Sequence, residues 1–144
     1  MRALSIGVGN PLRRDDGAAH AVLERIGAIE GVETLGLAQL APEVAAEMAG
    51  YDTVVFVDAD AGAVKVEVGP LCAAPAASAF THVLTPEEIV ELSRAAFGFS
   101  GRALLCRIPA EDFEFGEGLS GRTEEFAAEA ARELQKVFGG GGEG

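Results

Sequence analysis

Short apolar runs alternate with amphipathic segments along the chain. The runs at 3–9, 53–58 and 103–108 are apolar at successive positions, as is typical of strands buried on both faces of a parallel sheet. A further run at 32–37 predicts another strand. Over 64–68, valines alternate with charged residues, which predicts a half-exposed strand near a sheet edge.

Helical spacing follows two of these runs. After the first strand, Asp15 or Asp16 can supply a helix N-cap, and apolar residues then recur at helical spacing over 22–29. Pro42 is suited to a first helical position and predicts a short helix that continues through Met48.

Two further helices complete the pattern. The sequence Thr85-Pro86-Glu87-Glu88 is a capping box, and the last helix runs from about Thr123 and is terminated by Gly139, the first residue of the tail. Because strands and helices alternate throughout, we expect an α/β fold: a single-domain, three-layer sandwich with a mostly parallel sheet and helices on both faces. The domain would span 1–138, and 139–144 would form a flexible Gly-rich tail.

Composition narrows the classes of partner. The 144 residues are 49% hydrophobic, enough for one packed domain, and 23 acidic against 11 basic residues give a net charge of −12. Such a charge repels phosphate and anionic lipid, so we expect no nucleic-acid or membrane partner. No apolar run reaches the roughly 18 residues of a membrane span, and the start shows no signal-peptide layout. These features predict a cytoplasmic protein, which we expect to be a monomer.

The chain offers no obvious protein nucleophile. Cys72 and Cys106 have no C-x-x-C spacing and no base beside them in sequence, so we interpret both as small core residues. No G-x-S-x-G motif is present.

Three polar features lie at the ends of predicted elements: two follow strands and one precedes a helix. They are the segment 7–17, the sequence Asp58-Ala59-Asp60, and Thr81-His82. In open α/β sheets ligands bind beyond the carboxyl ends of the strands, so these features are expected to converge on one crevice.

The glycines of the first feature do not make a dinucleotide loop. The third glycine of G-x-G-x-x-G would fall at Leu12, and Asp15 and Asp16 would repel a pyrophosphate. Gly7 and Gly9 therefore more simply permit a tight turn after the strand.

Asp16, Asp58 and His82 together offer two carboxylates and an imidazole. Asp58 ends a wholly apolar strand, where an unpaired carboxylate is costly, whereas Asp60 suits a turn. This ligand set fits a borderline divalent metal such as nickel or zinc and leaves coordination positions open. The alternative is that Asp16 only caps the first helix and that His82 is structural.

His20 lies four residues after Asp16, so one helical turn could bring it near the same place. The simpler interpretation is a solvent-facing histidine on the first helix.

Four sequence elements resemble those of the [NiFe]-hydrogenase maturation proteases. The first is Gly7-Val8-Gly9-Asn10-Pro11-Leu12 followed by Asp15-Asp16-Gly17. The others are Phe56-Val57-Asp58-Ala59, Thr81-His82-x-Leu84 and the stretch 113–120, FEFGEGLS. The resemblance extends to about residue 138.

The resemblance implies an aspartic-type endopeptidase of the cytoplasm. Family members remove a C-terminal extension from a hydrogenase large-subunit precursor once nickel has been inserted. By motif position, Asp16, Asp58 and His82 match the family's metal-binding and catalytic residues. No tightly bound cofactor is implied, because the precursor carries the nickel. The family usually has D-G-G-T or H-Q-L-T after the second strand, and here only Gln39, Leu40 and Pro42 echo that pattern.

Two alternatives belong to other functional classes. A peptidyl-tRNA hydrolase-like esterase would use the interval from Asn10 to His20, but Ala19 and Ala21 replace that family's flanking residues and the chain is acidic. A nickel-protein binding or chaperone-like domain would use Asp16, Asp58 and His82 without cleaving anything.

Overall fold

The computed structural model describes residues 2–72 and 84–139. The strands are β1 (Ala3–Val8), β2 (Val32–Leu37), β3 (Thr53–Asp60), β4 (Glu67–Pro70) and β5 (Arg102–Pro109). The helices are the 3-10 helix η1 (Arg14–Gly17) and the α-helices α1 (Ala18–Ile26), α2 (Glu43–Met48), α3 (Pro86–Phe97) and α4 (Gly121–Gly139).

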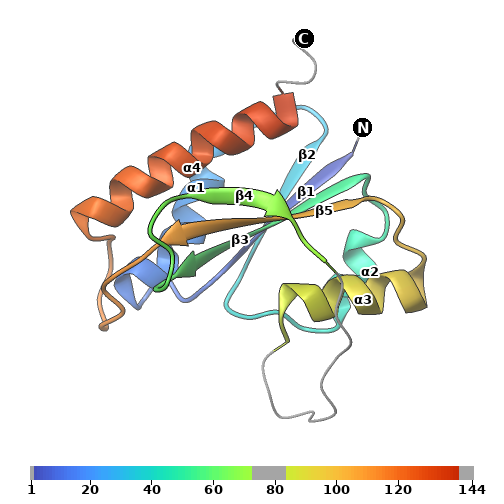
Figure 1. Cartoon of the computed structure of the whole chain (residues 1–144), viewed down its shortest axis with the longest axis horizontal. Coiled ribbons are helices and arrows are strands. Elements are labelled where there is room, and N and C mark those ends of the chain that lie inside the picture. The colour runs from blue at the N-terminus through green and yellow to red at the C-terminus, as the bar shows by residue number, and fades with distance from the viewer. Residues whose placement is uncertain (1, 73–83, 140–144) are drawn as a thin grey trace.

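One sheet with strand order β2-β1-β3-β5-β4 forms the middle layer. All neighbouring strands pair in parallel except β4, which runs antiparallel to β5. Helices α1 and α4 cover one face, and α2 and α3 cover the other (Figure 1). The expected three-layer α/β fold is therefore confirmed.

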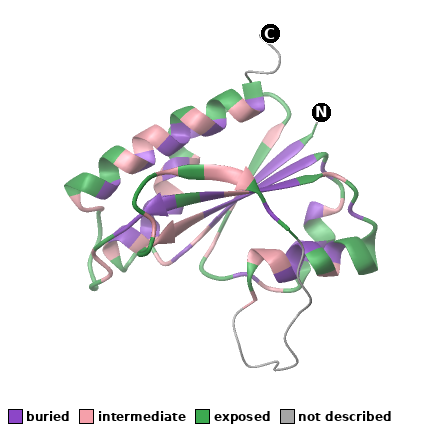
Figure 2. Ribbon diagram, in the orientation of Figure 1, coloured by how far each residue is buried: buried purple, intermediate pink, exposed green. Residues whose placement is uncertain are grey.

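The central strand β3 is buried on both faces, as its continuous apolar run predicts. Val55 and Val57 pack in the cluster under α1 and α4, and Val54 and Phe56 pack in the cluster under α2 and α3. Figure 2 shows the buried residues concentrated in the inner strands and on the sheet-facing sides of the helices. Burial gives way to partial exposure at Asp58, where β3 approaches its carboxyl end.

Local signals located α3 correctly and β4 less accurately. The Thr85 hydroxyl accepts the N–H of Glu88 at 3.1 Å, and the Glu88 carboxylate accepts the N–H of Thr85 at 2.9 Å. The edge strand begins only at Glu67, and Val64 precedes it with 78% of its surface exposed. Alternation identified the edge, but the preceding loop shares the same residue pattern.

The expectation that Asp15 or Asp16 caps the first helix is wrong. Gly17 occupies the N-cap position of α1 and makes no side-chain capping bond, because η1 comes between the loop and the helix. The two carboxylates instead turn toward other backbone segments, Asp15 toward residues 111–123 and Asp16 toward Asn10.

Two smaller expectations also need correction. Cys106 is buried as expected, but Cys72 is exposed because it follows the edge strand. Gly139, assigned to the tail, is the last residue of α4, and 140–144 lie outside the described residues.

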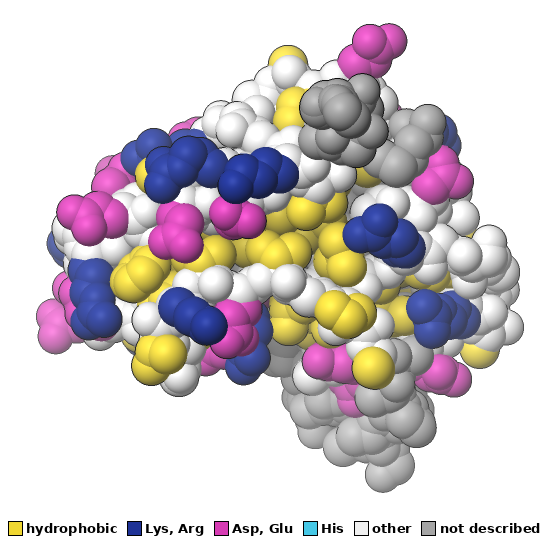
Figure 3. Space-filling model, turned by 45° about the horizontal axis from the view of Figure 1, so that its top comes forward, with side chains coloured by type: hydrophobic (Ala, Val, Ile, Leu, Met, Phe, Trp, Pro, Cys, Tyr) yellow, Lys and Arg dark blue, Asp and Glu magenta, His cyan; other side chains and the backbone are white. Residues whose placement is uncertain are grey.

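The surface mixes charged and apolar side chains. On the face shown in Figure 3, apolar side chains gather in a band across the middle, and charged side chains of both signs border it. Within the ranges 2–72 and 84–139, no helix is long and apolar enough to cross a membrane.

Candidate functional site

Asp58 lies among the carboxyl ends of three parallel strands. The strand register places it opposite Val8 on β1 and opposite Arg107 on β5. Strand β1 is followed directly by Gly9 and Asn10, so the end of β3 lies beside the loop that leads to η1. This is the edge at which open α/β sheets bind their ligands.

The loop after β1 folds back so that Asp16 lies against Gly9 and Asn10. Gly9 has a φ of +152°, and a Cβ atom there would collide with the carbonyl oxygen of Asp16. The N–H of Asn10 donates to Oδ2 of Asp16 at 2.7 Å. A Cβ on Gly17 would lie 2.9 Å from Cα of Pro11, so that glycine also permits a close approach. The glycine, asparagine and aspartate positions thus form one compact turn that fixes the Asp16 carboxylate.

Asp16 is close enough to Asp58 for its charge to act on the Asp58 carboxyl. Burial is the largest influence on Asp58 and, with the charges of Asp16 and Asp60, raises the pKa of its carboxyl from 3.8 to about 6. The N–H of Ala59 and the charge of Arg107 oppose this rise only in part. The structure therefore brings together two of the residues that the sequence selected.

Asp60 behaves as the turn residue that the sequence predicts. Its Oδ1 accepts the N–H of Gly62 at 2.8 Å, and its Oδ2 lies 3.1 Å from Nε of Arg107. Arg107 also pairs with Glu67 on β4 at 3.5 Å. Asp60 therefore has local partners that compensate its charge.

The third selected residue, His82, lies outside the described residues together with Thr81. Among residues 2–72 and 84–139, no group of three or more His, Cys, Asp or Glu side chains could hold a metal ion. The described part of the site consists of two carboxylates, which supply only part of a coordination shell for a divalent metal.

Asp15 has a role that sequence reasoning missed. Its carboxylate is fully buried and accepts bonds from the N–H groups of Glu111, Asp112 and Ser120 and from the hydroxyls of Ser120 and Thr123, at 2.7–3.0 Å. Burial by itself would raise the pKa, but the hydrogen bonds outweigh burial and lower the pKa of Asp15 from 3.8 to about 2. Asp15 is an ionised anchor.

The anchor ties the late F-E-x-G-x-x-L-S element to the loop after β1. Gly116 donates its N–H to the carbonyl of Leu12 at 2.8 Å, and its own carbonyl accepts the N–H of Arg14 at 3.0 Å. One sequence signal was available, since Ser120 lies where an N-cap of α4 belongs and accepts the N–H of Thr123 at 3.3 Å. The hydroxyls of Ser120 and Thr123 both donate to Asp15, and this shared acceptor could not be identified without the fold.

His20 is not the solvent-facing residue that the helix pattern suggests. Its ring is half-buried, and Nε2 lies 2.7 Å from the carbonyl oxygen of Gly9. A Cβ on Gly36 would come within 2.8 Å of Nδ1, so the missing side chain leaves room for the ring. His20 therefore supports the loop that presents Asp16.

Neither cysteine can act beside the carboxylates. Burial is the main cause that raises the pKa of Cys106 to about 12, and the charge of Glu133 adds to it. Cys72 follows Leu71, whose N–H donates to the carbonyl of Ala103 near the amino end of β5. Cys72 therefore lies toward the end of the sheet opposite the carboxylates. The thiols are therefore inert or remote.

The segment after β2, where the sequence departs from the resembled family, lies at the same sheet edge as the carboxylates. Leu40 is buried in the α2/α3 core cluster, whereas Gln39 and Pro42 are exposed. Gln39 is thus the residue of this altered pattern that can offer hydrogen-bonding groups to a partner.

Several solved structures that share this fold are named as hydrogenase maturation proteases. No protein family model and no curated protein sequence matches the chain. A [NiFe] hydrogenase maturation protease HycI from Thermococcus kodakarensis KOD1 is 20% identical with a TM-score of 0.74, over 95% of this chain and 92% of that one. Hydrogenase maturating endopeptidase HybD from E. coli is 20% identical with a TM-score of 0.77, over 99% and 94%. The hydrogenase 2 maturation peptidase from Thaumarchaeota archaeon SCGC_AB-539-E09 is 17% identical with a TM-score of 0.70, over 96% and 99%. The chain therefore has the fold of these hydrogenase maturation proteases.

Proposed function

We propose that this protein is an endopeptidase that removes the C-terminal extension of a [NiFe]-hydrogenase large-subunit precursor after nickel insertion. One observation carries the proposal: the charge of Asp16, in the turn after β1, acts on Asp58 near the carboxyl end of β3, in a fold shared with proteins named as hydrogenase maturation proteases. The proposal includes action as a monomer in the cytoplasm.

Nickel belongs to the substrate in this proposal. Asp16, Asp58 and His82 would complete the coordination of a nickel ion that the precursor already holds, because two carboxylates and one imidazole leave the remaining positions to the precursor. Docking is then favoured only when the metal is present, since the metal contributes binding free energy to the complex. The protein itself keeps no tightly bound cofactor.

Peptide cleavage would use water as the nucleophile. Water adds to the scissile carbonyl carbon, its proton passes to a carboxylate, and a proton then reaches the departing amine. Water can be activated by the substrate's nickel, which lowers its pKa, or by Asp16 or Asp58 as general base. Both routes predict continued cleavage in the presence of serine- and cysteine-directed covalent inhibitors, whereas recovery of a labelled nucleophile would contradict both.

Mass spectrometry of a hydrogenase precursor tests the proposal. The wild-type chain should release a short C-terminal peptide from nickel-loaded precursor and none from nickel-free precursor. Asp58→Asn should slow release at least about 100-fold, because the amide neither accepts the proton nor ligates nickel well. Glu91→Gln makes the same chemical change on the exposed side of α3 and should cleave normally. Equal cleavage of both precursor forms would refute nickel recognition.

The other functional classes are separated by the same assay. Metal-dependent binding of the precursor without cleavage would replace the protease with a nickel-protein binding domain. The structure offers no support for the tRNA hydrolase, because the His20 ring is hydrogen-bonded to the carbonyl of Gly9. The net charge of −12 also opposes binding of tRNA.

A further inference from the structure

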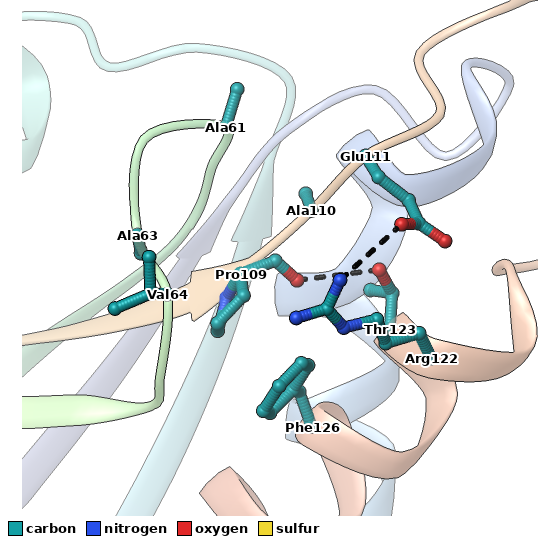
Figure 4. Close-up of a pocket in the computed structure, with 9 residues that line it drawn as sticks. All are labelled: Ala61, Ala63, Val64, Pro109, Ala110, Glu111, Arg122, Thr123 and Phe126. Carbon is teal, nitrogen blue, oxygen red and sulfur yellow. Dashed lines mark hydrogen bonds and ion pairs between the residues drawn. The ribbon is translucent and has the colours of Figure 1, made fainter.

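A cavity of about 190 Å³ opens at the carboxyl-end edge of the sheet, next to α4 (Figure 4). Its walls come from the loop after β3, the end of β5 and the first turns of α4. Six of its nine lining side chains are apolar: Ala61, Ala63, Val64, Pro109, Ala110 and Phe126. The cavity is several times the roughly 30 Å³ that one water occupies in the liquid, so it can hold one aliphatic side chain.

Asp60 connects this cavity to the carboxylate site. The carbonyl oxygen of Asp60 accepts the N–H of Ala63 at 3.2 Å and that of Ala110 at 3.3 Å, and both alanines line the cavity. Asp60 lies two residues after Asp58 on β3, and its charge acts on the Asp58 carboxyl. The cavity and the carboxylates thus share the end of one strand.

One wall of the cavity is held by the Asp15 anchor. Thr123 lines the cavity, and its hydroxyl donates to Oδ2 of Asp15 at 2.9 Å. Asp15 directly precedes Asp16, so the hydrogen bonds of Asp15 hold both this cavity wall and the backbone next to a site carboxylate. The cavity is therefore formed before any ligand arrives, which lowers the entropic cost of binding.

An ion pair at the cavity mouth selects an uncharged occupant. Arg122 and Glu111 lie 3.9 Å apart, with exposed side-chain fractions of 65% and 51%, and the guanidinium lies 5.6 Å from the ring centre of Phe126. The charges of Arg122 and Glu111 offset each other, so a charged side chain would gain little electrostatic binding free energy at the cavity mouth. A peptide amide suits this mouth, because guanidinium N–H groups donate to carbonyls and carboxylates accept from N–H groups. Val64, 78% exposed, adds an apolar side chain to the lining.

We propose that the cavity is a specificity subsite for one uncharged aliphatic side chain, from valine to methionine in size, of a peptide substrate. The peptide backbone lies across Arg122 and Glu111 while its scissile bond reaches Asp16 and Asp58. This inference rests on the proposed endopeptidase function for its substrate, but the cavity's preference for a capped aliphatic residue can be measured without cleavage.

Binding is tested with N-acetyl-leucine methylamide on the isotope-labelled full chain. We expect saturable NMR shifts at Ala61, Ala63, Ala110 and Thr123, with at least about fivefold weaker binding of the alanine and aspartate analogues. Ala63→Leu, which fills the cavity, should weaken leucine-probe binding at least about fivefold. Ala61→Leu is a second filling variant at an exposed loop position. Ala95→Leu makes the same change on the exposed side of α3 and should bind as wild type.

Cleavage of nickel-loaded precursor provides the second measurement. Ala63→Leu should lower kcat/KM about tenfold while cleavage still requires nickel. Replacing the aliphatic precursor residue nearest the cleaved bond with aspartate should have a similar effect, and the two changes together should cost little more than either alone, because they remove one shared contact.

The two measurements separate the subsite from the proposed activity. Saturable leucine-probe binding without any precursor cleavage would overturn the protease function and leave the subsite standing. No saturable shift, equal binding of all three probes, or unchanged leucine-probe binding in both filling variants would overturn the subsite. Additive losses in the cleavage assay would also overturn it.

Discussion

Asp15 and Asp58 are carboxylates at the same edge of one sheet, yet their surroundings are opposite. Asp15 is fully buried and accepts five hydrogen bonds from residues 111–123. Asp58 is only half-buried, and the nearby charges of Asp16 and Asp60 are unfavourable to its ionisation. The pKa of Asp15 is lowered to about 2, whereas that of Asp58 is raised to about 6.

The difference separates a structural carboxylate from a functional candidate. Full hydrogen bonding compensates the burial of the Asp15 charge, so that side chain can stabilise the two loops it joins. Asp58 keeps a charge that its environment disfavours, and such groups gather at sites that bind or transform ligands. The degree of hydrogen bonding, more than burial, assigns the two roles.

The largest expected effect comes from Asp15→Asn. The amide would direct N–H groups at donors and lose the ionic hydrogen bonds, so we expect a loss of about 3–5 kcal/mol in the free energy of unfolding at pH 7. Urea denaturation measures this, and Asp112→Asn, at a partly exposed ion pair with Arg14, should lose less than about 1 kcal/mol.

The loss of stability at low pH provides a second measurement for Asp15. Because its folded-state pKa of about 2 is below 3.8, the stabilisation is present above pH 4 and is lost as the pH falls toward 2. Asp15→Asn should lack that part of the acid dependence. A variant as stable as wild type would show that the buried carboxylate is not an anchor.

Asp58→Asn should change the free energy of unfolding at pH 7 in the opposite direction. A folded-state pKa of about 6 against 3.8 means that the folded chain binds the proton more tightly, so this contribution to stability is present below pH 4 and is lost as the pH rises through 6. At pH 7 the variant should be more stable by about 1–3 kcal/mol, since partial exposure reduces the full effect. Denaturation at pH 4 and pH 7 measures it. A destabilised variant at pH 7 would contradict the comparison.

A smaller change sharpens the contribution of one donor to Asp15. Thr123→Val keeps the shape of the side chain but removes the hydroxyl that donates to Asp15 at 2.9 Å, and should lower the free energy of unfolding by about 1–2 kcal/mol. Thr123→Ser keeps the hydroxyl and provides the matched control in the same denaturation experiment. If serine lost as much as valine, the hydroxyl would not be the stabilising group.

The smallest expected effect concerns Arg107, which partly offsets the raised pKa of Asp58. Arg107→Gln should move that pKa above about 6, because the compensating charge is gone. Carboxyl carbon shifts followed by NMR against pH would show it. Arg25→Gln removes a guanidinium paired with Glu124 away from the site and should leave the Asp58 pKa unchanged. A fall in the variant's pKa would reverse the assignment of Arg107.

Much of the fold was predictable from local signals. The continuous apolar run of β3 predicted a strand buried on both faces, and the capping box at Thr85 located the start of α3. The N-cap expectation for Asp15 and Asp16 was wrong because a carboxylate before a helix has the same local sequence whether it caps the helix or bonds elsewhere. The proximity of Asp16 to Asp58 was predictable because parallel strands end at the same edge, while the role of both as site residues stays a prediction. The prediction for His82 as a third ligand stays a prediction.

By itself, the sequence determined the alternation of strands and helices, the buried central strand and the placement of acidic residues after strand ends. These follow from hydrophobic periodicity and backbone preferences, which act over a few residues. Only the tertiary structure decided that Asp15 is an anchor and that Asp58 is the carboxylate with the raised pKa. The Asp15 donors lie 96–108 residues away along the chain, and Asp58 depends on charges from the loop after β1. Hydrogen bonds and electrostatic interactions depend on distance in space, which local sequence patterns do not encode.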